Sequence, residues 1–117
     1  MRKFGLVLLS GVLALTTPAA QGHSTLVTST PKSGAVIKTF PKTFSLTFNE
    51  EILKLPGKEP SRVQLIAPNR MRISLGKVAI VRQVLTVPMN KASVKAGKYR
   101  LTYRVVSKDG HVIKGAI

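Results

Sequence analysis

The stretch TFSLTFNE, residues 43–50, decides the fold class of this chain. Its apolar residues Phe44, Leu46 and Phe48 alternate with polar ones. Because successive side chains of an extended strand point to opposite faces, this alternation gives the strand one apolar face and one polar face. The pattern predicts a half-buried strand, which is typical of an antiparallel sheet with one face on a core.

Similar short segments lie on both sides of this strand, separated by turn residues. We predict further strands at STLVTSTP (24–31), RVQLIAP (62–68), MRISL (71–75), VLTVP (84–88) and KYRLTYRVVS (98–107). The loop PNR at 68–70 joins two of them as a hairpin, and EEILKLPGKEPS (50–61) is expected to be irregular because it holds two prolines and a glycine. No stretch has a helical period, so the chain is predicted to be an all-β sandwich or barrel.

The last segment, HVIKGAI at 111–117, begins as a strand and stops almost at once. Strands average about five to six residues, so we expect a truncated C-terminal strand that forms a weak sheet edge.

Residues 1–22 have the pattern of a secretory signal peptide. Arg2 and Lys3 form a basic start, residues 4–16 are apolar and uncharged, and small residues follow. Ala20 and Gly22 favour cleavage after Gly22, whereas cleavage after Ala20 would leave two residues ahead of the next histidine. We therefore predict a signal peptide at 1–22, a soluble exported domain at 23–117, and His23 as the new first residue.

Composition narrows the chemistry of this domain. Removing 22 of the 117 residues leaves 95, enough for one modest core, and there is no cysteine for a disulfide or a thiolate site. Without Arg2 and Lys3, 17 basic residues face four acidic ones, a net charge of +13. Such a charge favours anionic partners, but the few aromatic residues and the spread of Lys and Arg along the chain argue against nucleic acid. A solubilising basic surface explains the charge.

Two histidines and one aspartate suggest a metal site. If His23 is the first residue, its α-amine and its imidazole Nδ1 can chelate one ion, and an α-amine loses its proton more readily than lysine does. In the stretch SKDGH (107–111), Asp109 and His111 project to the same side of an extended chain, and Gly110 lets the backbone bend. Three nitrogens and one oxygen suit tetragonal Cu(II), with Zn(II) or Ni(II) bound more weakly. The alternative is an ordinary polar turn, because Asp-Gly is a common turn pair.

The two ends of the domain carry a family resemblance. The segments HSTLVTSTPKSGAVIKTFPKTFSLTFNE, from His23, and AGKYRLTYRVVSKDGHVIKG, from Ala96, resemble the CopC family of periplasmic copper-binding proteins. The resemblance implies a small Greek-key β-barrel or sandwich, immunoglobulin-like in its arrangement. It also implies a monomeric periplasmic protein of copper resistance or homeostasis, with an inner-membrane copper transport protein as a partner.

The same resemblance assigns roles to individual residues. It makes His23, Asp109 and His111 the ligands of one Cu(II) ion, and Glu50 a neighbour that hydrogen-bonds a ligand or a bound water. An exposed charge at a strand end is the alternative for Glu50. Some relatives carry a second, Cu(I) site rich in methionine, but the corresponding region here has none, and Met71 and Met89 are expected to pack as apolar residues. We therefore expect a single copper site.

Two other functions remain open at this point. A copper-dependent polysaccharide monooxygenase also uses an N-terminal histidine, but it needs an aromatic substrate face, and Tyr99 and Tyr103 are expected to point into the core. With one aspartate and two histidines, a hydrolytic Ser/His/Asp set is not credible either, so we do not expect an enzyme. The second alternative is a basic immunoglobulin-like interaction module that binds no metal.

Overall fold

The computed structural model describes residues 25–90 and 94–117 and places eight strands and no helix in them. The strands are β1 Leu26–Thr30, β2 Thr43–Phe48, β3 Arg62–Ile66, β4 Arg72–Ile73, β5 Ala79–Val81, β6 Val84–Pro88, β7 Arg100–Val106 and β8 Val112–Ala116. The all-β prediction is confirmed. A membrane-crossing helix of sufficient length and apolarity does not occur in the described residues.

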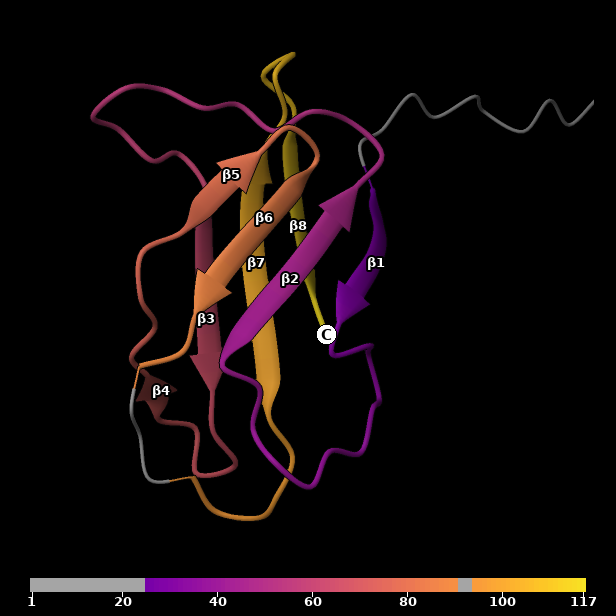
Figure 1. Ribbon diagram of the computed structural model, residues 1–117, viewed down its shortest axis with the longest axis vertical. Coiled ribbons are helices and arrows are strands. Elements are labelled where there is room, and N and C mark those ends of the chain that lie inside the picture. Colours follow the sequence, from indigo (N-terminus) through magenta and orange to yellow (C-terminus); the bar gives the residue numbers. More distant parts are fainter. Residues whose placement is uncertain (1–24, 91–93) are drawn as a thin grey trace, which may run out of the picture.

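The strands form two antiparallel sheets that lie one behind the other (Figure 1). One sheet has the order β1-β2-β6-β5 and the other β4-β3-β7-β8. The chain passes from one sheet to the other after β2, β4 and β6, so β2 pairs with β6 and β3 pairs with β7. This crossing ties the two sheets into one sandwich, and it brings the ends of β2 and β7 together.

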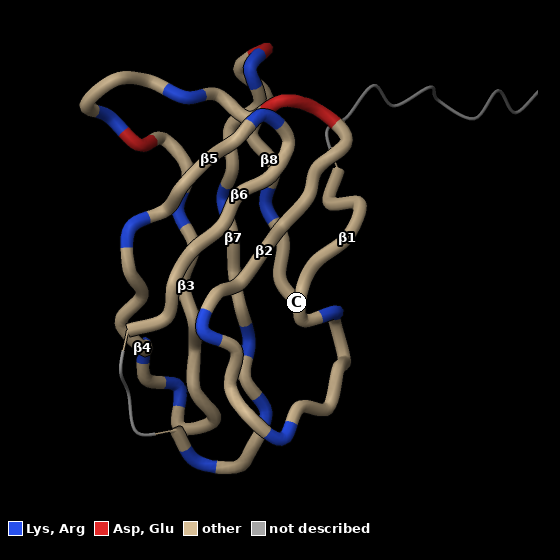
Figure 2. The backbone as a smooth tube through the Cα atoms, viewed as in Figure 1, with Lys and Arg blue, Asp and Glu red and all other residues tan. Residues whose placement is uncertain are grey.

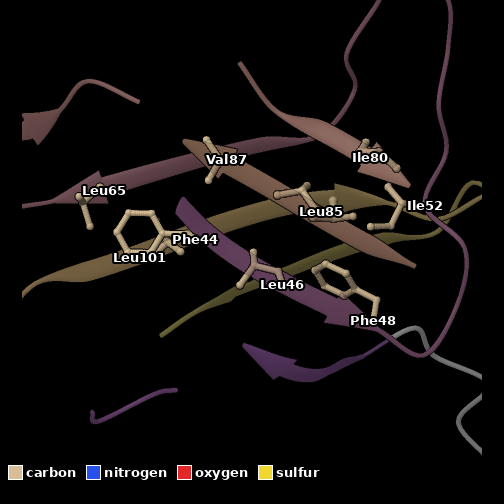
Figure 3. Close-up of a cluster of buried hydrophobic side chains, with 10 residues drawn as sticks. Phe44, Leu46, Phe48, Ile52, Leu65, Ile80, Leu85, Val87 and Leu101 are labelled. Atoms are coloured by element: carbon tan, nitrogen blue, oxygen red, sulfur yellow. The ribbon is translucent and has the colours of Figure 1, made fainter. Parts of the chain in front are cut away.

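The core lies between the sheets, as the alternation in β2 predicts. Phe44, Leu46 and Phe48 are all buried, and they share one apolar cluster with Leu101 of β7 (Figure 3). Val105 of β7 belongs to the same cluster. The other buried apolar residues are Ile52, Leu65, Ile80, Leu85 and Val87. Tyr99 and Tyr103 point toward this core as expected, although both are only partly buried.

The hairpin of β3 and β4 is also as predicted, but two other elements differ from the sequence-based expectation. The short strand β5 is not predicted, because three apolar residues show too little alternation to be recognised. Strand β8 is better formed than expected: its five residues all pair with β7, and the backbones of Ile117 and Leu101 exchange two further hydrogen bonds of 2.9 Å.

The end of β8 contains two small residues, Gly115 and Ala116. Glycine and alanine have low strand propensity, yet both residues pair with β7. In the structure Gly115 pairs with Tyr103, whose ring occupies the space that a side chain at position 115 would need. Packing of the partner strand therefore outweighs the local preference.

Candidate metal centre

The loop from Ser107 to His111 joins β7 to β8 as a tight turn. The Gly110 N–H donates to the Ser107 carbonyl at 2.8 Å, and the Ser107 N–H donates to the His111 carbonyl at 2.8 Å. Gly110 has φ 88°, a left-handed conformation that glycine adopts without steric cost. The turn places Asp109 and His111 at the surface, where both side chains are exposed.

Ser107 holds the turn in place through a hydrogen bond of its buried side chain. The residue is 1% exposed, and its Oγ accepts a hydrogen bond from the His111 N–H at 3.1 Å. Since a buried hydroxyl must find a partner, this bond holds the backbone of His111 in one position. The sequence-based prediction assigned no role to Ser107; a serine at the start of a turn is the signal that could have found it.

Backbone bonds hold the same loop against the segment that follows β2. The Lys108 N–H donates to the Glu51 carbonyl and the Leu53 N–H donates to the Val106 carbonyl, each at 2.9 Å. The Glu51 carboxylate also lies 3.4 Å from the Lys108 Nζ and 3.5 Å from the Arg82 Nε. These side chains are largely exposed, so the ion pairs add little stability, but Glu51 links the three chain segments around the turn.

Three metal-binding side chains converge at this end of the sandwich. Potential ligand atoms of Glu50, Asp109 and His111 all lie within 4.8 Å of one another. Two atoms that bind one ion at about 2 Å each are at most about 4 Å apart, so small side-chain rotations would bring all three onto one ion. It is the one such cluster among the residues that the structure describes. Figure 2 shows the acidic segments of the chain near this end.

Glu50 was predicted to stand beside the metal rather than to bind it. The structure brings a ligand atom of its carboxylate within 4.8 Å of ligand atoms of both Asp109 and His111. Its role, as a ligand or as a group that orients one, stays a prediction. The convergence of Glu50 with Asp109 and His111 comes from the pairing of the chain after β2 with the end of β7, where Ile52 forms a bridge with Ser107.

The remaining predicted ligand, His23, lies outside the described residues. The first described residue, Thr25, is anchored beside the cluster. Its N–H donates to Asn49 Oδ1 at 2.7 Å, and its carbonyl accepts from the Asn49 N–H at 3.1 Å. Thr25 and His111 also line the same surface pocket of about 290 Å³. The chain therefore enters the fold next to His111.

Tyr103 lines that pocket as well. Its ring contacts Phe48 edge-on, with ring centroids 5.6 Å apart, and so joins the pocket to the core. Burial raises the pKa of the Tyr103 hydroxyl above its ordinary value of 10.0, so the phenol stays protonated even further above physiological pH than an exposed one does. Tyr103 therefore shapes the pocket without adding charge to it.

The two methionines behave differently from each other. Met89 packs against the core as predicted, whereas Met71 is 66% exposed, which corrects the expectation that it packs as an apolar residue. Met71 precedes the two-residue strand β4 at a sheet edge, where little structure covers it.

Replacing Gly110 by alanine tests the geometry of the turn. A left-handed conformation costs an L-residue about 1–2 kcal/mol, so Gly110→Ala should lower the free energy of unfolding by about that amount in a urea titration. Gly110→Asn is the matched control, because asparagine tolerates this conformation better. Equal losses in the two variants would mean that the turn does not depend on the left-handed conformation.

The fold and the open cluster of carboxylates and imidazole define a small β-sandwich with a candidate metal site at its surface. The family model of the CopC domain matches residues 26–117, so the chain belongs to the CopC family. This confirms the family resemblance noted in the sequence.

Individual relatives agree with this assignment. Copper resistance protein C of Xanthomonas campestris pv. juglandis is 31% identical over 109 residues, which cover 89% of this chain and 84% of that protein. Protein YobA of Escherichia coli K12 is 27% identical over 87% of this chain and 81% of its own length.

Solved structures share the sandwich. The crystal structure of CopC from Methylosinus trichosporium OB3b superposes with a TM-score of 0.64 at 26% identity, covering 80% of this chain and 88% of that one. PcoC, a copper resistance protein from Escherichia coli, superposes with a TM-score of 0.65 at 22% identity, covering 79% and 93%, and supports the fold alone. Together the family and its relatives support a function connected with copper, and they bear out the prediction that the chain is not an enzyme.

Proposed function

We propose that this protein binds one Cu(II) ion through His23, Asp109 and His111, with Glu50 completing or orienting the site. The observation that carries the proposal is the convergence of Glu50, Asp109 and His111 within 4.8 Å at the surface. A carboxylate pair with one imidazole offers oxygen and nitrogen ligands, which suit divalent ions. The function of the relatives in copper resistance favours copper among these ions.

The reach of the chain supports a role for His23. An extended chain spans at most about 3.6 Å per residue, so position 23 lies within roughly 7 Å of Thr25. Thr25 shares a pocket with His111, and it is hydrogen-bonded to Asn49, the neighbour of Glu50. An N-terminal His23 is therefore within range of the same ion. Its amine and imidazole would raise the number of nitrogen ligands to three, the set that tetragonal Cu(II) favours.

The cellular role follows from the predicted export signal. Processing after Gly22 would release residues 23–117 as a soluble, monomeric protein in the periplasm and would create the free amine that the site uses. There the protein would serve copper resistance or homeostasis, passing the ion to an inner-membrane transport protein. An open site at the surface suits such a transfer, because the cluster residues Asp109 and His111 are exposed.

Copper should stabilise the fold by mass action. At a free Cu(II) concentration 100 times the Kd, binding adds about 2.7 kcal/mol to the free energy of unfolding. For a domain of this size that raises Tm by roughly 10–20 °C, measured by thermal unfolding with and without the ion. His111→Ala should lose most of this gain. Lys98→Ala, which removes an exposed side chain outside the cluster, should keep it.

A metal-free interaction module gives the opposite result. If copper leaves Tm unchanged in the native protein, or raises it equally in His111→Ala, then the cluster does not hold the ion. The intact mass of the exported protein, measured together with its copper content, would establish the N-terminus and the stoichiometry.

A further inference from the structure

The two sheets differ completely in charge. The strands β1, β2, β5 and β6 contain no charged residue, whereas the strands of the other sheet contain five, all of them cations. These five are Arg62, Arg72, Arg100, Arg104 and Lys114, and all are exposed. Their strand neighbours Leu65, Leu101 and Val105 face the core, so the cations lie on the outer face of this sheet. We call these five residues the basic face.

The register aligns these cations in rows across the strands. Arg104 pairs directly with Arg62 on one side and with Lys114 on the other. Figure 2 shows the three blue segments side by side on β3, β7 and β8. A second row forms where Ile66 pairs with both Arg72 and Arg100.

Like charges placed directly opposite each other destabilise a sheet. The ion pairs of Glu51 are made with Arg82 and Lys108, neither of which belongs to the basic face. None of the five cations of the basic face has an ion-pair partner among the described residues. Glu59 lines a pocket with Arg62 and Arg104 and offsets part of their charge, so the basic face keeps a net positive charge for an external partner.

The spacing of the charges indicates which kind of anionic partner fits the basic face. Neighbouring strands are about 4.8 Å apart, so the row from Arg62 to Lys114 spans about 10 Å, and Arg100 lies about 13 Å from Arg104 along β7. Charges spread in this way fit an extended anionic surface rather than a single small anion. A pocket of about 400 Å³ beside Arg62 and Arg104 is also lined by Glu59, whose carboxylate would repel an anion there.

We propose that the basic face docks this protein onto an anionic phospholipid membrane. A stable protein interface needs an apolar or aromatic centre. Between the two rows of cations the sheet offers Gln64, Thr102 and Ala116 instead. Electrostatic adsorption to a charged bilayer requires no such centre, and each cation near the surface contributes to it.

Docking would also orient the metal cluster. Only two residue pairs of β7 and β8 separate the row of Arg104 and Lys114 from the loop that carries Asp109 and His111. A protein adsorbed by this face would therefore hold its cluster close to the membrane surface. The docking itself does not depend on copper, because no residue of the basic face belongs to the cluster.

The test is co-sedimentation of the protein, purified from the exporting cell, with vesicles of phosphatidylglycerol and phosphatidylcholine. We expect binding at low salt, little binding to pure phosphatidylcholine, and release as salt rises and the Debye length shrinks. The triple variant Arg62→Gln, Arg104→Gln, Lys114→Gln should lower the partition coefficient on the order of 100-fold, because one cation contributes about fivefold.

The matched control removes the same charge elsewhere. Lys32, Lys38 and Lys42 are exposed in the segment between β1 and β2, and changing all three to Gln leaves the same net charge as the triple variant of the basic face. This control should lose less than about fivefold. Equal losses in the two triples would mean that net charge, not the basic face, drives binding, and would overturn the proposal.

Two further measurements complete the test. The single variant Arg104→Gln should bind about fivefold more weakly and unfold at an equal or higher temperature, since it relieves the like-charge row. His111→Ala should bind vesicles as the native protein does, so the outcome is independent of copper. Binding to polyglutamate but not to anionic vesicles would identify an acidic polypeptide as the partner and refute the membrane.

Discussion

Adding one glycine ahead of His23 in the exported protein should weaken Cu(II) binding by more than about 100-fold. The extension turns the α-amine of His23 into an amide, which no longer offers a lone pair without losing a proton, and it breaks the chelate ring with the imidazole. Residues that only orient metal ligands already contribute about 10–100-fold to affinity, and here one ligand is lost and a second loses its chelate partner. Competition with a copper chelator of known affinity measures the change.

The control carries an extension of the same length at the other end of the chain, and it keeps both histidines. A glycine added after Ile117 instead should leave the affinity unchanged, and Tm without copper should stay the same in both extended proteins. If the N-terminally extended protein binds Cu(II) as tightly as the native one, then the amine of His23 is not a ligand. Binding by Glu50, Asp109 and His111 alone would then remain to be tested by His111→Ala.

Phe48→Ala should lower the free energy of unfolding by about 3–5 kcal/mol, the range for truncating a buried aromatic side chain. Phe48 is 1% exposed at the end of β2, and its ring contacts that of Tyr103. A domain of this size has about 5–15 kcal/mol in total, and with no cysteine in the chain no disulfide supplements its core. The measurement is urea unfolding followed by circular dichroism, at equal metal content.

A substitution at an exposed strand position is the control, because it changes strand propensity without removing a buried side chain. Val81 is 71% exposed on β5, so Val81→Ala should change stability by less than about 1 kcal/mol. If Phe48→Ala lowers the free energy of unfolding as little as Val81→Ala does, then the core does not depend on this ring.

Phe48→Ala should also weaken copper binding, because Phe48 supports Tyr103 in the pocket that His111 lines.

Much of the fold is readable from alternation alone. In β2 and β7 the period of two assigns Phe44, Leu46 and Leu101 to the interior, and the structure buries all three. Three apolar residues without clear alternation hide β5, and the brevity of the last segment makes β8 look weaker than it is. Both strands form because a longer neighbour supplies hydrogen bonds and apolar cover, which local sequence cannot reveal.

The candidate site, like the fold, could be predicted only in part from the sequence. The residue types and the Asp-Gly-His spacing are enough to identify Asp109 and His111 as candidate ligands. The contribution of Ser107 and Glu51 depends on contacts across the turn, and neither residue belongs to a motif strong enough to be recognised in the sequence.

By itself the sequence determined the all-β class and the half-buried strands, because these follow from residue type and from a period of two, and its Asp-Gly-His stretch made Asp109 and His111 candidate ligands. Only the tertiary structure decided that Glu50 meets Asp109 and His111, and that Arg62, Arg104 and Lys114 form one row. Both depend on the register between strands far apart in the chain. Register is set by how the sheets bury their apolar faces together, which no single segment specifies.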